Sequence, residues 1–315
     1  MKLLITRPLP DPVVDAARAR FEVTVRHDTL PLNAEELRAS LRDFDLVLPT
    51  LGDRYQAEVF ADVPNPRARM LANFGVGYNH IDVAAARAAG LVVSNTPGAV
   101  TDATADIAMT LILMTARRAG EGERLVRAGT WEGWHPTQML GMHVSGRRLG
   151  IIGMGRIGKA IARRAHAGFG MEVVFFNRSP VADAGVPAQQ VPLKEAMAAD
   201  VVVVAVPGGR ETYHLINTEI LSHMQRHAIF VNISRGDVVD EAALVAALTG
   251  NNIGGAGLDV YEFEPRLHPG LLTLENVTLL PHLGTAALEV RIGMGLMAVD
   301  NLLAFADGRP LPNPV

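Results

Sequence analysis

The stretch Leu149-Gly150-Ile151-Ile152-Gly153-Met154-Gly155-Arg156-Ile157-Gly158 decides the fold of this chain. Its apolar start is typical of a buried strand, and the apolar residues after Gly158 recur at helical spacing. The three glycines between them match the pattern G-x-G-x-x-G. In this pattern Gly153 allows a tight turn, Gly155 lets the backbone approach a pyrophosphate, and Gly158 lets the helix pack closely on the strand. We therefore predict a dinucleotide site at the helix N-terminus, rather than a tight turn without a ligand.

The residues after the next apolar strand, Glu172 to Phe176, bear on the choice of nucleotide. An acidic residue there accepts hydrogen bonds from the adenosine ribose and repels a 2′-phosphate. This chain has Asn177, Arg178 and Ser179 instead. An amide, a guanidinium and a hydroxyl suit a 2′-phosphate, because arginine binds phosphate well. The sequence favours NADP(H), with NAD(H) possible; in the plainer alternative, Arg178 is an ordinary solvated loop residue.

Length and composition exclude several classes of protein. The 315 residues suit two domains, and a hydrophobic fraction of 49% is enough for substantial cores. A net charge of -4 without a basic run gives little support to nucleic-acid or membrane-surface binding. The absence of cysteine excludes disulfides, thiolate nucleophiles and cysteine metal sites, and we predict no metal site. With neither a signal peptide nor a membrane-length apolar run, a cytoplasmic protein is expected.

Strands and helices alternate along the whole chain. In residues 99–286 the β-branched run 200–206 is typical of a fully buried parallel strand. Further strands are expected at 229–233, 255–260 and 277–280, with helices at 193–199, 217–224 and 241–249. The pattern predicts an α/β doubly wound parallel sheet, a Rossmann dinucleotide-binding domain.

Both chain ends are expected to form a second, smaller domain. Strands are predicted at 3–5, 21–25, 45–49, 70–73 and 91–95, with helices at 12–20 and after Asn33, which suits an N-cap. A final helix at about 287–307 should cross back to this part. The prediction is a discontinuous, flavodoxin-like α/β substrate domain of residues 1–98 and 287–315.

Residues 102–119 are predicted to form one long apolar helix. So apolar a helix should be buried on several sides. Packing against the same helix of another subunit is our preferred interpretation, and burial within one chain is the alternative.

Three polar side chains stand at the predicted carboxyl ends of successive strands, where ligands of such sheets bind. Arg235 can bind a carboxylate and polarise a ketone. His282 can give a proton to an oxygen while hydride reaches the carbon. A carboxylate, Glu264 or Asp259, can fix the histidine tautomer. Together they suit reduction of a 2-keto acid, although singly each could be a solvated or structural residue.

The chain resembles the D-isomer-specific 2-hydroxyacid dehydrogenase family, and within it the glyoxylate/hydroxypyruvate reductases. The resemblance covers nearly the whole chain and is carried by the stretches 73–82, 149–158, 231–240, 257–260 with 264–265, and 281–284. It implies that Arg235 binds and polarises the substrate, His282 donates the proton and Glu264 orients His282.

The resemblance also implies binding positions. The substrate carboxylate would meet the backbone amides of Gly75, Val76 and Gly77, while Leu51 and Gly52 would shape another wall of the pocket. Cofactor contacts are implied, beyond Val76, Arg235 and His282, at Thr104, Gly153, Met154, Gly155, Arg156, Ile157, Gly158, Asn177, Arg178, Ser179, Val206, Pro207, Thr212, Ile233, Ser234, Asp259 and Gly284.

Members of the family are usually homodimers, and Trp134 matches a position where some insert an aromatic side chain into the partner's active site; simple surface packing is the alternative. The implied activity is NADPH-dependent reduction of glyoxylate and hydroxypyruvate. Reduction of 2-ketogluconate, pyruvate or phenylpyruvate remains open. A redox-sensing interaction protein of the same superfamily is also open, because such proteins keep the three catalytic positions. A generic sugar-nucleotide or amino-acid dehydrogenase would explain the glycine pattern but not the combination of Arg235, Glu264 and His282.

Overall fold

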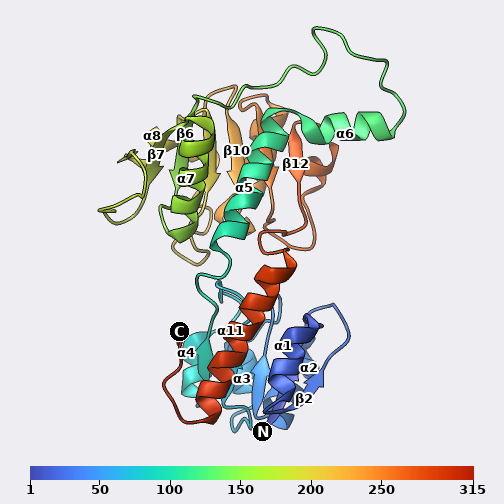
Figure 1. Cartoon of the computed structure of the whole chain (residues 1–315), viewed down its shortest axis with the longest axis vertical. Coiled ribbons are helices and arrows are strands. Elements are labelled where there is room, and N and C mark those ends of the chain that lie inside the picture. Colours follow the sequence, from blue (N-terminus) through green and yellow to red (C-terminus); the bar gives the residue numbers. More distant parts are fainter. The chain divides into compact units, whose positions relative to one another are not determined.

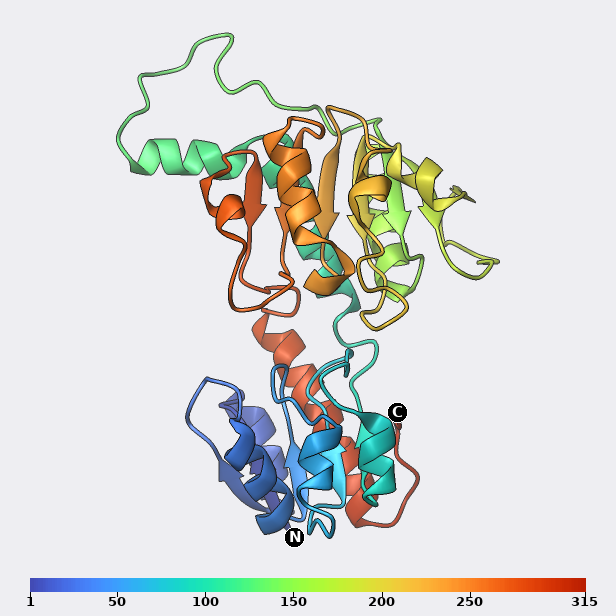
Figure 2. The ribbon, with the colours of Figure 1, turned by 180° about the vertical axis from the view of Figure 1, so that it is seen from behind.

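The computed structural model describes residues 1–315 and divides them into two compact units. Unit 1 combines Met1–Val100 with Ala286–Val315, and unit 2 is Thr101–Thr285. Each unit is built on one parallel sheet with helices on both faces (Figures 1 and 2). The fold class predicted from the alternating pattern is therefore confirmed.

Unit 2 contains a seven-stranded parallel sheet in the order β12-β11-β10-β9-β6-β7-β8. Helices α5 and α7 cover one face of it, and α8, α9 and α10 cover the other. The strands are β6 Arg148–Ile152, β7 Glu172–Phe176, β8 Ala188–Gln190, β9 Val201–Val204, β10 Ile229–Asn232, β11 Gly255–Leu258 and β12 Val277–Leu279. The helices are α5 Thr101–Ala116, α6 Ala119–Arg127, α7 Arg156–Phe169, α8 Leu193–Met197, α9 Thr218–Leu221 and α10 Glu241–Thr249, with 3-10 turns at Gly236–Val238 and Pro269–Thr273.

Unit 1 contains a five-stranded parallel sheet in the order β2-β1-β3-β4-β5, the flavodoxin order. Helices α1 and α11 pack on one face, while α2, α3 and α4 pack on the other. The strands are β1 Lys2–Ile5, β2 Glu22–Val25, β3 Leu46–Leu48, β4 Met70–Ala72 and β5 Val92–Ser94. The helices are α1 Asp11–Arg18, α2 Ala34–Asp43, α3 Ala57–Ala61, α4 Val83–Ala88 and α11 Leu288–Ala306. The predicted final helix thus does pack with the N-terminal part of the chain.

The predicted cap of α2 is confirmed in detail. The Asn33 side chain accepts from the backbone N–H groups of Glu35 and Glu36, and the Glu36 carboxylate accepts from the N–H of Asn33 at 2.8 Å. This reciprocal capping box satisfies N–H groups that a helix start leaves free.

The predicted extent of the long apolar helix is wrong. The helix does not run from 102 to 119, because α5 ends at Ala116 and Arg118 takes a left-handed conformation (φ 53°) before α6 begins. Many of its apolar side chains are buried within the chain, and the predicted packing against another subunit stays a prediction. Leu111 and Ile112 are fully buried, and β11 approaches so closely that a Cβ on Gly257 would lie 2.9 Å from Leu111 Cβ.

Four elements escaped prediction: α3, α4, α6 and β8. Hydrophobic periodicity is weak in α3, α4 and β8, because they span at most six residues each, and α6 has no buried residue. None of the helices combines the length and apolar character that crossing a bilayer requires.

Candidate active site

The glycine-rich turn shows why each of its three positions is glycine. Gly153 has φ +105°, and a Cβ there would lie 2.8 Å from Ala205 O. A Cβ on Gly158 would lie 2.2 Å from Gly153 O, so a side chain would push α7 away from the turn. Gly155, in contrast, faces open space and is the N-cap of α7. Gly153 and Gly158 are therefore needed because backbone atoms lie too close for a side chain. Gly155 instead leaves room for a ligand beside the free N–H groups of the helix.

The residues after β7 lie beside this turn. Asn177 Oδ1 accepts from the N–H of Met154 at 3.2 Å, and Asn177 Nδ2 donates to Ser179 O at 2.9 Å. The exposed side chain of Arg178 forms an ion pair with Glu211, from the loop after β9. The glycine cradle, the start of α7 and the Arg178 cation together fit a phosphate-bearing dinucleotide.

The three predicted catalytic side chains follow neighbouring strands. Arg235 follows β10, Glu264 follows β11 and His282 follows β12, and these strands are adjacent in the sheet. His282 Nδ1 and Glu264 Oε2 are 3.0 Å apart, and Glu264 Oε1 accepts from the N–H of Tyr261 at 3.0 Å. With both carboxylate oxygens engaged, Glu264 holds the ring of His282 in one orientation and leaves Nε2 on its other side.

Charges in this group shift the pKa values of its members. Burial raises the pKa of Glu264, but the hydrogen bond and charge of His282, the Tyr261 N–H and the Arg235 charge together hold that pKa below its usual range. Burial lowers the pKa of Arg235, which the charges of Glu264 and Asp237 oppose. Glu264 therefore stays ionised at neutral pH, as a carboxylate that orients a histidine must.

Hydrogen bonds between buried side chains and backbone groups fix the loop that carries His282. Both oxygens of buried Asp259 accept from backbone N–H groups, of Leu283 at 2.6 Å and of Gly284 at 2.8 Å. Thr104 Oγ1 donates to Gly284 O at 3.1 Å. Burial raises the pKa of Asp259, against these N–H groups. Asp259 and Thr104 thus hold the loop that begins at His282.

Asn232 holds the loop of Arg235. Its Oδ1 accepts from the N–H of Ser234 and its Nδ2 donates to Arg235 O, each at 3.0 Å. Ser234 Oγ donates to Val206 O at 2.7 Å, which ties this loop to the one after β9. The next residue must be glycine, because a Cβ on Gly236 would lie 1.8 Å from the carbonyl carbon of Tyr261.

The predicted cofactor positions of unit 2 differ in exposure. A set at the strand ends and the glycine turn is buried: Thr104, Gly153, Met154, Gly158, Ile233, Ser234, Asp259 and Gly284. Gly155, Arg156, Arg178, Ser179 and Pro207 are exposed, and Ile157, Asn177, Val206, Arg235 and Thr212 are half-buried; Thr212 Oγ1 donates to Pro207 O at 2.8 Å.

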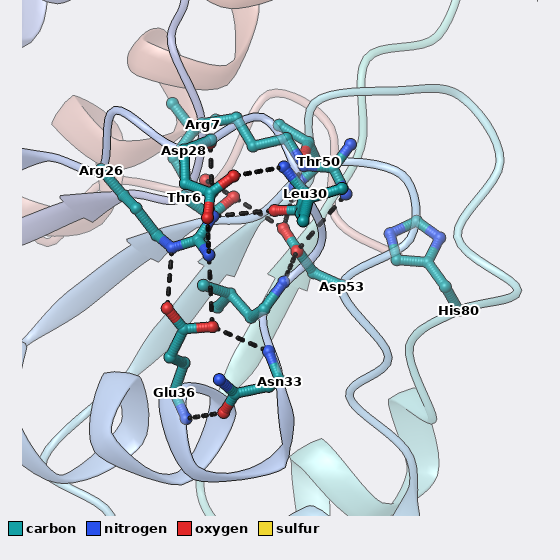
Figure 3. A network of polar contacts seen from close by, with 12 residues as sticks. Thr6, Arg7, Arg26, Asp28, Leu30, Asn33, Glu36, Thr50, Asp53 and His80 are labelled. Carbon is teal, nitrogen blue, oxygen red and sulfur yellow. Dashed lines mark hydrogen bonds and ion pairs between the residues drawn. The ribbon is translucent and has the colours of Figure 1, made fainter. Parts of the chain in front are cut away.

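In unit 1 the predicted wall residues Leu51 and Gly52 lie in a loop between Thr50 and Asp53. Figure 3 shows the contacts of the Asp53 carboxylate that hold this loop. Asp53 is fully buried and accepts from Thr6 Oγ1 at 2.6 Å and from the backbone N–H groups of Thr50 and Leu32, each at 2.9 Å. Arg7 Nη2 lies 3.8 Å from Asp53. Gly52 takes φ +100°, where a Cβ would lie 2.9 Å from Arg7 Nη2. This network fixes the loop between β3 and α3.

The predicted amide loop Gly75–Gly77 follows β4, next to β3 in the same sheet. Its three residues are half-buried. Asn73 Nδ2 donates to Gly75 O and to Gly77 O, each at 3.0 Å. Sequence reasoning gave no role to Asn73 or Asn232, although each is a polar residue that ends an apolar run, and this signal could have found both.

Trp134 is not part of either group. It lies in the segment between α6 and β6, which loops out from unit 2 (Figure 1), and its side chain is 80% exposed. The predicted contact with a partner's active site stays a prediction.

The fold and this site define a class, the two-unit α/β proteins that bind a dinucleotide on a parallel sheet. The family model "D-isomer specific 2-hydroxyacid dehydrogenase, NAD binding domain" matches residues 109–284. The chain is 45% identical to a glyoxylate reductase of Thermococcus onnurineus, over all of this chain and 95% of that protein. The chain therefore belongs to the D-isomer specific 2-hydroxyacid dehydrogenase family.

Solved structures agree with this assignment. A protein from Thermus thermophilus has a TM-score of 0.92 and 43% identity, over all of both chains. An NADPH-dependent glyoxylate/hydroxypyruvate reductase from Sinorhizobium meliloti, in complex with NADP and malonate, has a TM-score of 0.88 and 35% identity, over all of this chain and 96% of that one.

Proposed function

We propose that this chain reduces small 2-keto acids, glyoxylate and hydroxypyruvate above all, to the corresponding 2-hydroxy acids with NADPH. The observation that carries the proposal is the hydrogen bond of 3.0 Å between Glu264 and His282. These two residues follow β11 and β12, and Arg235 follows β10, which is next to β11 in the sheet. The names of the relatives in Thermococcus onnurineus and Sinorhizobium meliloti support the choice of substrate.

The chemistry needs a proton, a hydride and charge stabilisation. The nicotinamide, when bound, supplies the hydride to C2 of the keto acid. We assign to His282 Nε2 the proton that the C2 oxygen receives, because Nδ1 is occupied by Glu264. Arg235 would polarise the C2 carbonyl and stabilise negative charge on its oxygen. The ionised Glu264 would stabilise the protonated ring before the transfer.

The substrate carboxylate is assigned to backbone amides of unit 1, at Gly75, Val76 and Gly77, with Leu51 and Gly52 as another wall. Such amides bind an anion without a bulky side chain, which suits substrates as small as glyoxylate. The preference for NADPH is assigned to Asn177, Arg178 and Ser179, since none of them is acidic and Arg178 carries a charge that a 2′-phosphate can pair with. We propose a homodimer as the assembly, with Trp134 as a residue that reaches the partner.

The initial rate of absorbance loss at the nicotinamide band tests this proposal, with glyoxylate and hydroxypyruvate and with NADPH compared with NADH. Fast loss with NADPH is expected. Fast loss only with NADH would keep the reaction and reject the cofactor preference. No loss with either cofactor, even with pyruvate, phenylpyruvate or 2-ketogluconate, would reject the enzyme and favour the interaction protein.

A further inference from the structure

All three backbone carbonyls of the loop Gly75–Gly77 are held by side-chain amides. Asn73 Nδ2 donates to Gly75 O and Gly77 O at 3.0 Å, and Asn95 Nδ2 donates to Val76 O at 2.8 Å. Gly75 O also accepts from the N–H of Thr96 at 3.1 Å. Asn73 is fully buried at the end of β4, and Asn95 is half-buried just after the neighbouring β5.

The orientation of the Asn73 amide is fixed from its other end. His80 Nε2 lies 3.0 Å from Asn73 Oδ1, and His80 is itself buried. With Oδ1 facing a ring nitrogen and Nδ2 facing two carbonyls, only this placement of the amide atoms satisfies all the contacts.

Fastening these carbonyls also fixes three N–H groups. In a planar trans peptide unit, the C=O of one residue and the N–H of the next point in opposite directions. The N–H groups of Val76, Gly77 and Tyr78 are therefore turned away from Asn73 and Asn95. None of the three donates to an acceptor in the chain. Successive backbone N–H groups that have no acceptor in the chain can bind an anion such as a carboxylate.

We infer that Asn73 and Asn95 form an amide clamp that turns the N–H groups of Val76, Gly77 and Tyr78 toward the substrate carboxylate. The inference rests on the proposed function in one respect, that this loop receives that carboxylate. Asn73 and Asn95 touch neither substrate nor cofactor; they are positioning residues that act through the backbone. The clamp adds Tyr78, through its N–H, to the groups that bind the substrate.

The test compares two asparagines that have the same burial and different neighbours. Asn73→Leu removes the clamp without adding charge. Asn301→Leu is the control, because Asn301 is also fully buried in unit 1 and donates Nδ2 to two oxygens, Met297 O at 2.8 Å and Asn313 Oδ1 at 3.1 Å. Asn95→Ala removes only the hydrogen bond to Val76 O, and its half-buried site keeps the variant folded if Asn73→Leu fails.

Asn73→Leu is expected to raise KM for glyoxylate about 10- to 100-fold, the range for one lost hydrogen bond to a charged group. The inhibition constant of oxamate, an unreactive carboxylate analogue, should rise in parallel, while kcat and the Kd of NADPH change by less than about threefold. Asn95→Ala should show a smaller rise in KM. Asn301→Leu should lower the melting temperature and leave KM unchanged.

Equal KM changes in the Asn73 and Asn301 variants, or unchanged KM in both clamp variants, would overturn the inference. A crystal structure of the Asn73→Leu variant tests the clamp independently of the proposed function. The Gly75 and Gly77 carbonyls should turn away from residue 73, and an unchanged loop would overturn the clamp whatever the activity. If the unaltered chain turns over no keto acid, the proposed function is rejected. The crystal structure of Asn73→Leu still shows whether Asn73 holds the loop carbonyls.

Discussion

The guanidinium of Arg178 is paired with the carboxylate of Glu211 at the mouth of the predicted cofactor site. Arg178 follows β7, whereas Glu211 lies in the loop after β9, so the pair spans two chain segments on the same side of the sheet. Both side chains are more than three-quarters exposed, so a ligand phosphate can compete for the guanidinium. If Arg178 binds a 2′-phosphate as proposed, Glu211 competes for the same guanidinium, and the sequence pattern does not point to Glu211.

Replacing Arg178 by Ala should weaken NADPH binding by about tenfold or more and change NADH binding little, because only NADPH carries the phosphate that the guanidinium would bind. Fluorescence titration with both cofactors measures this. Equal losses for the two would reject the phosphate role of Arg178.

Replacing Glu211 by Gln should act in the opposite direction. The variant lacks a carboxylate that competes for Arg178 and repels the 2′-phosphate, so affinity for NADPH relative to NADH should rise, roughly twofold to fivefold at low salt. The gain should shrink as salt is added. A lower NADPH affinity in Glu211→Gln would show that the carboxylate supports the site instead.

Replacing a glycine of the turn by alanine should have different effects at Gly158 and at Gly155. Gly158→Ala places a Cβ against Gly153 O and should cost about 1–3 kcal/mol of stability. Gly155→Ala meets no protein atom and should keep the melting temperature within about 2 °C, while NADPH binding falls at least about tenfold. Thermal melts and cofactor titration on both variants check the contrast, and full cofactor binding by Gly155→Ala would contradict the pyrophosphate site.

His282→Ala should lower kcat by about 10²- to 10⁴-fold with little change in the Kd of NADPH, because it removes the assigned proton donor. His227→Ala is the matched control, since His227 pairs with Asp200 at the other end of the strands. Near-normal turnover by His282→Ala would reject its role.

Two glutamates of unit 2 should affect stability with opposite pH dependence. The pKa of Glu264 is lowered, so its ionised form stabilises the fold above its unfolded value and loses this effect as the pH falls through the folded value. Burial and the charge of Glu262 raise the pKa of Glu241, and its buried Oε2 has no hydrogen-bond partner. Its favourable contribution is therefore present at low pH and is lost as the pH rises through the raised value.

At pH 8, Glu264→Gln should accordingly melt lower than the unaltered chain and Glu241→Gln should melt higher, each by a few degrees. Both differences should shrink toward pH 4. Shifts of the same sign at pH 8 would contradict this assignment.

Most of the fold could be predicted because its sheets are buried on both faces. The run Val201–Val204 is apolar without interruption, and the cap at Asn33 marks a helix start by its own chemistry. The break at Arg118 could not be predicted, because apolar periodicity continues up to it and only the backbone turns. The burial of α5 depends on β11, a strand with two glycines that lies far away in the chain. The composition of a helix does not show which part of the chain will cover it.

The candidate site was predictable where chemistry and strand ends coincide. Arg235, Glu264 and His282 carry groups whose reactivity points to a role, and each follows an apolar run. The amide clamp and the Asp53 network could not be found in this way. They join residues from different strands through backbone groups, and a sequence does not show which carbonyl an asparagine will meet.

The order of the units along the chain has a consequence for synthesis. Unit 2 lies wholly between the two parts of unit 1, and α11, which packs on α1, comes last. During translation, residues 101–285 leave the ribosome before α11 is made, so unit 2 can complete its core while α1 alone covers one face of the N-terminal sheet. The part of that face that α11 later covers stays exposed until then, and it is apolar surface that a chaperone for nascent chains could bind.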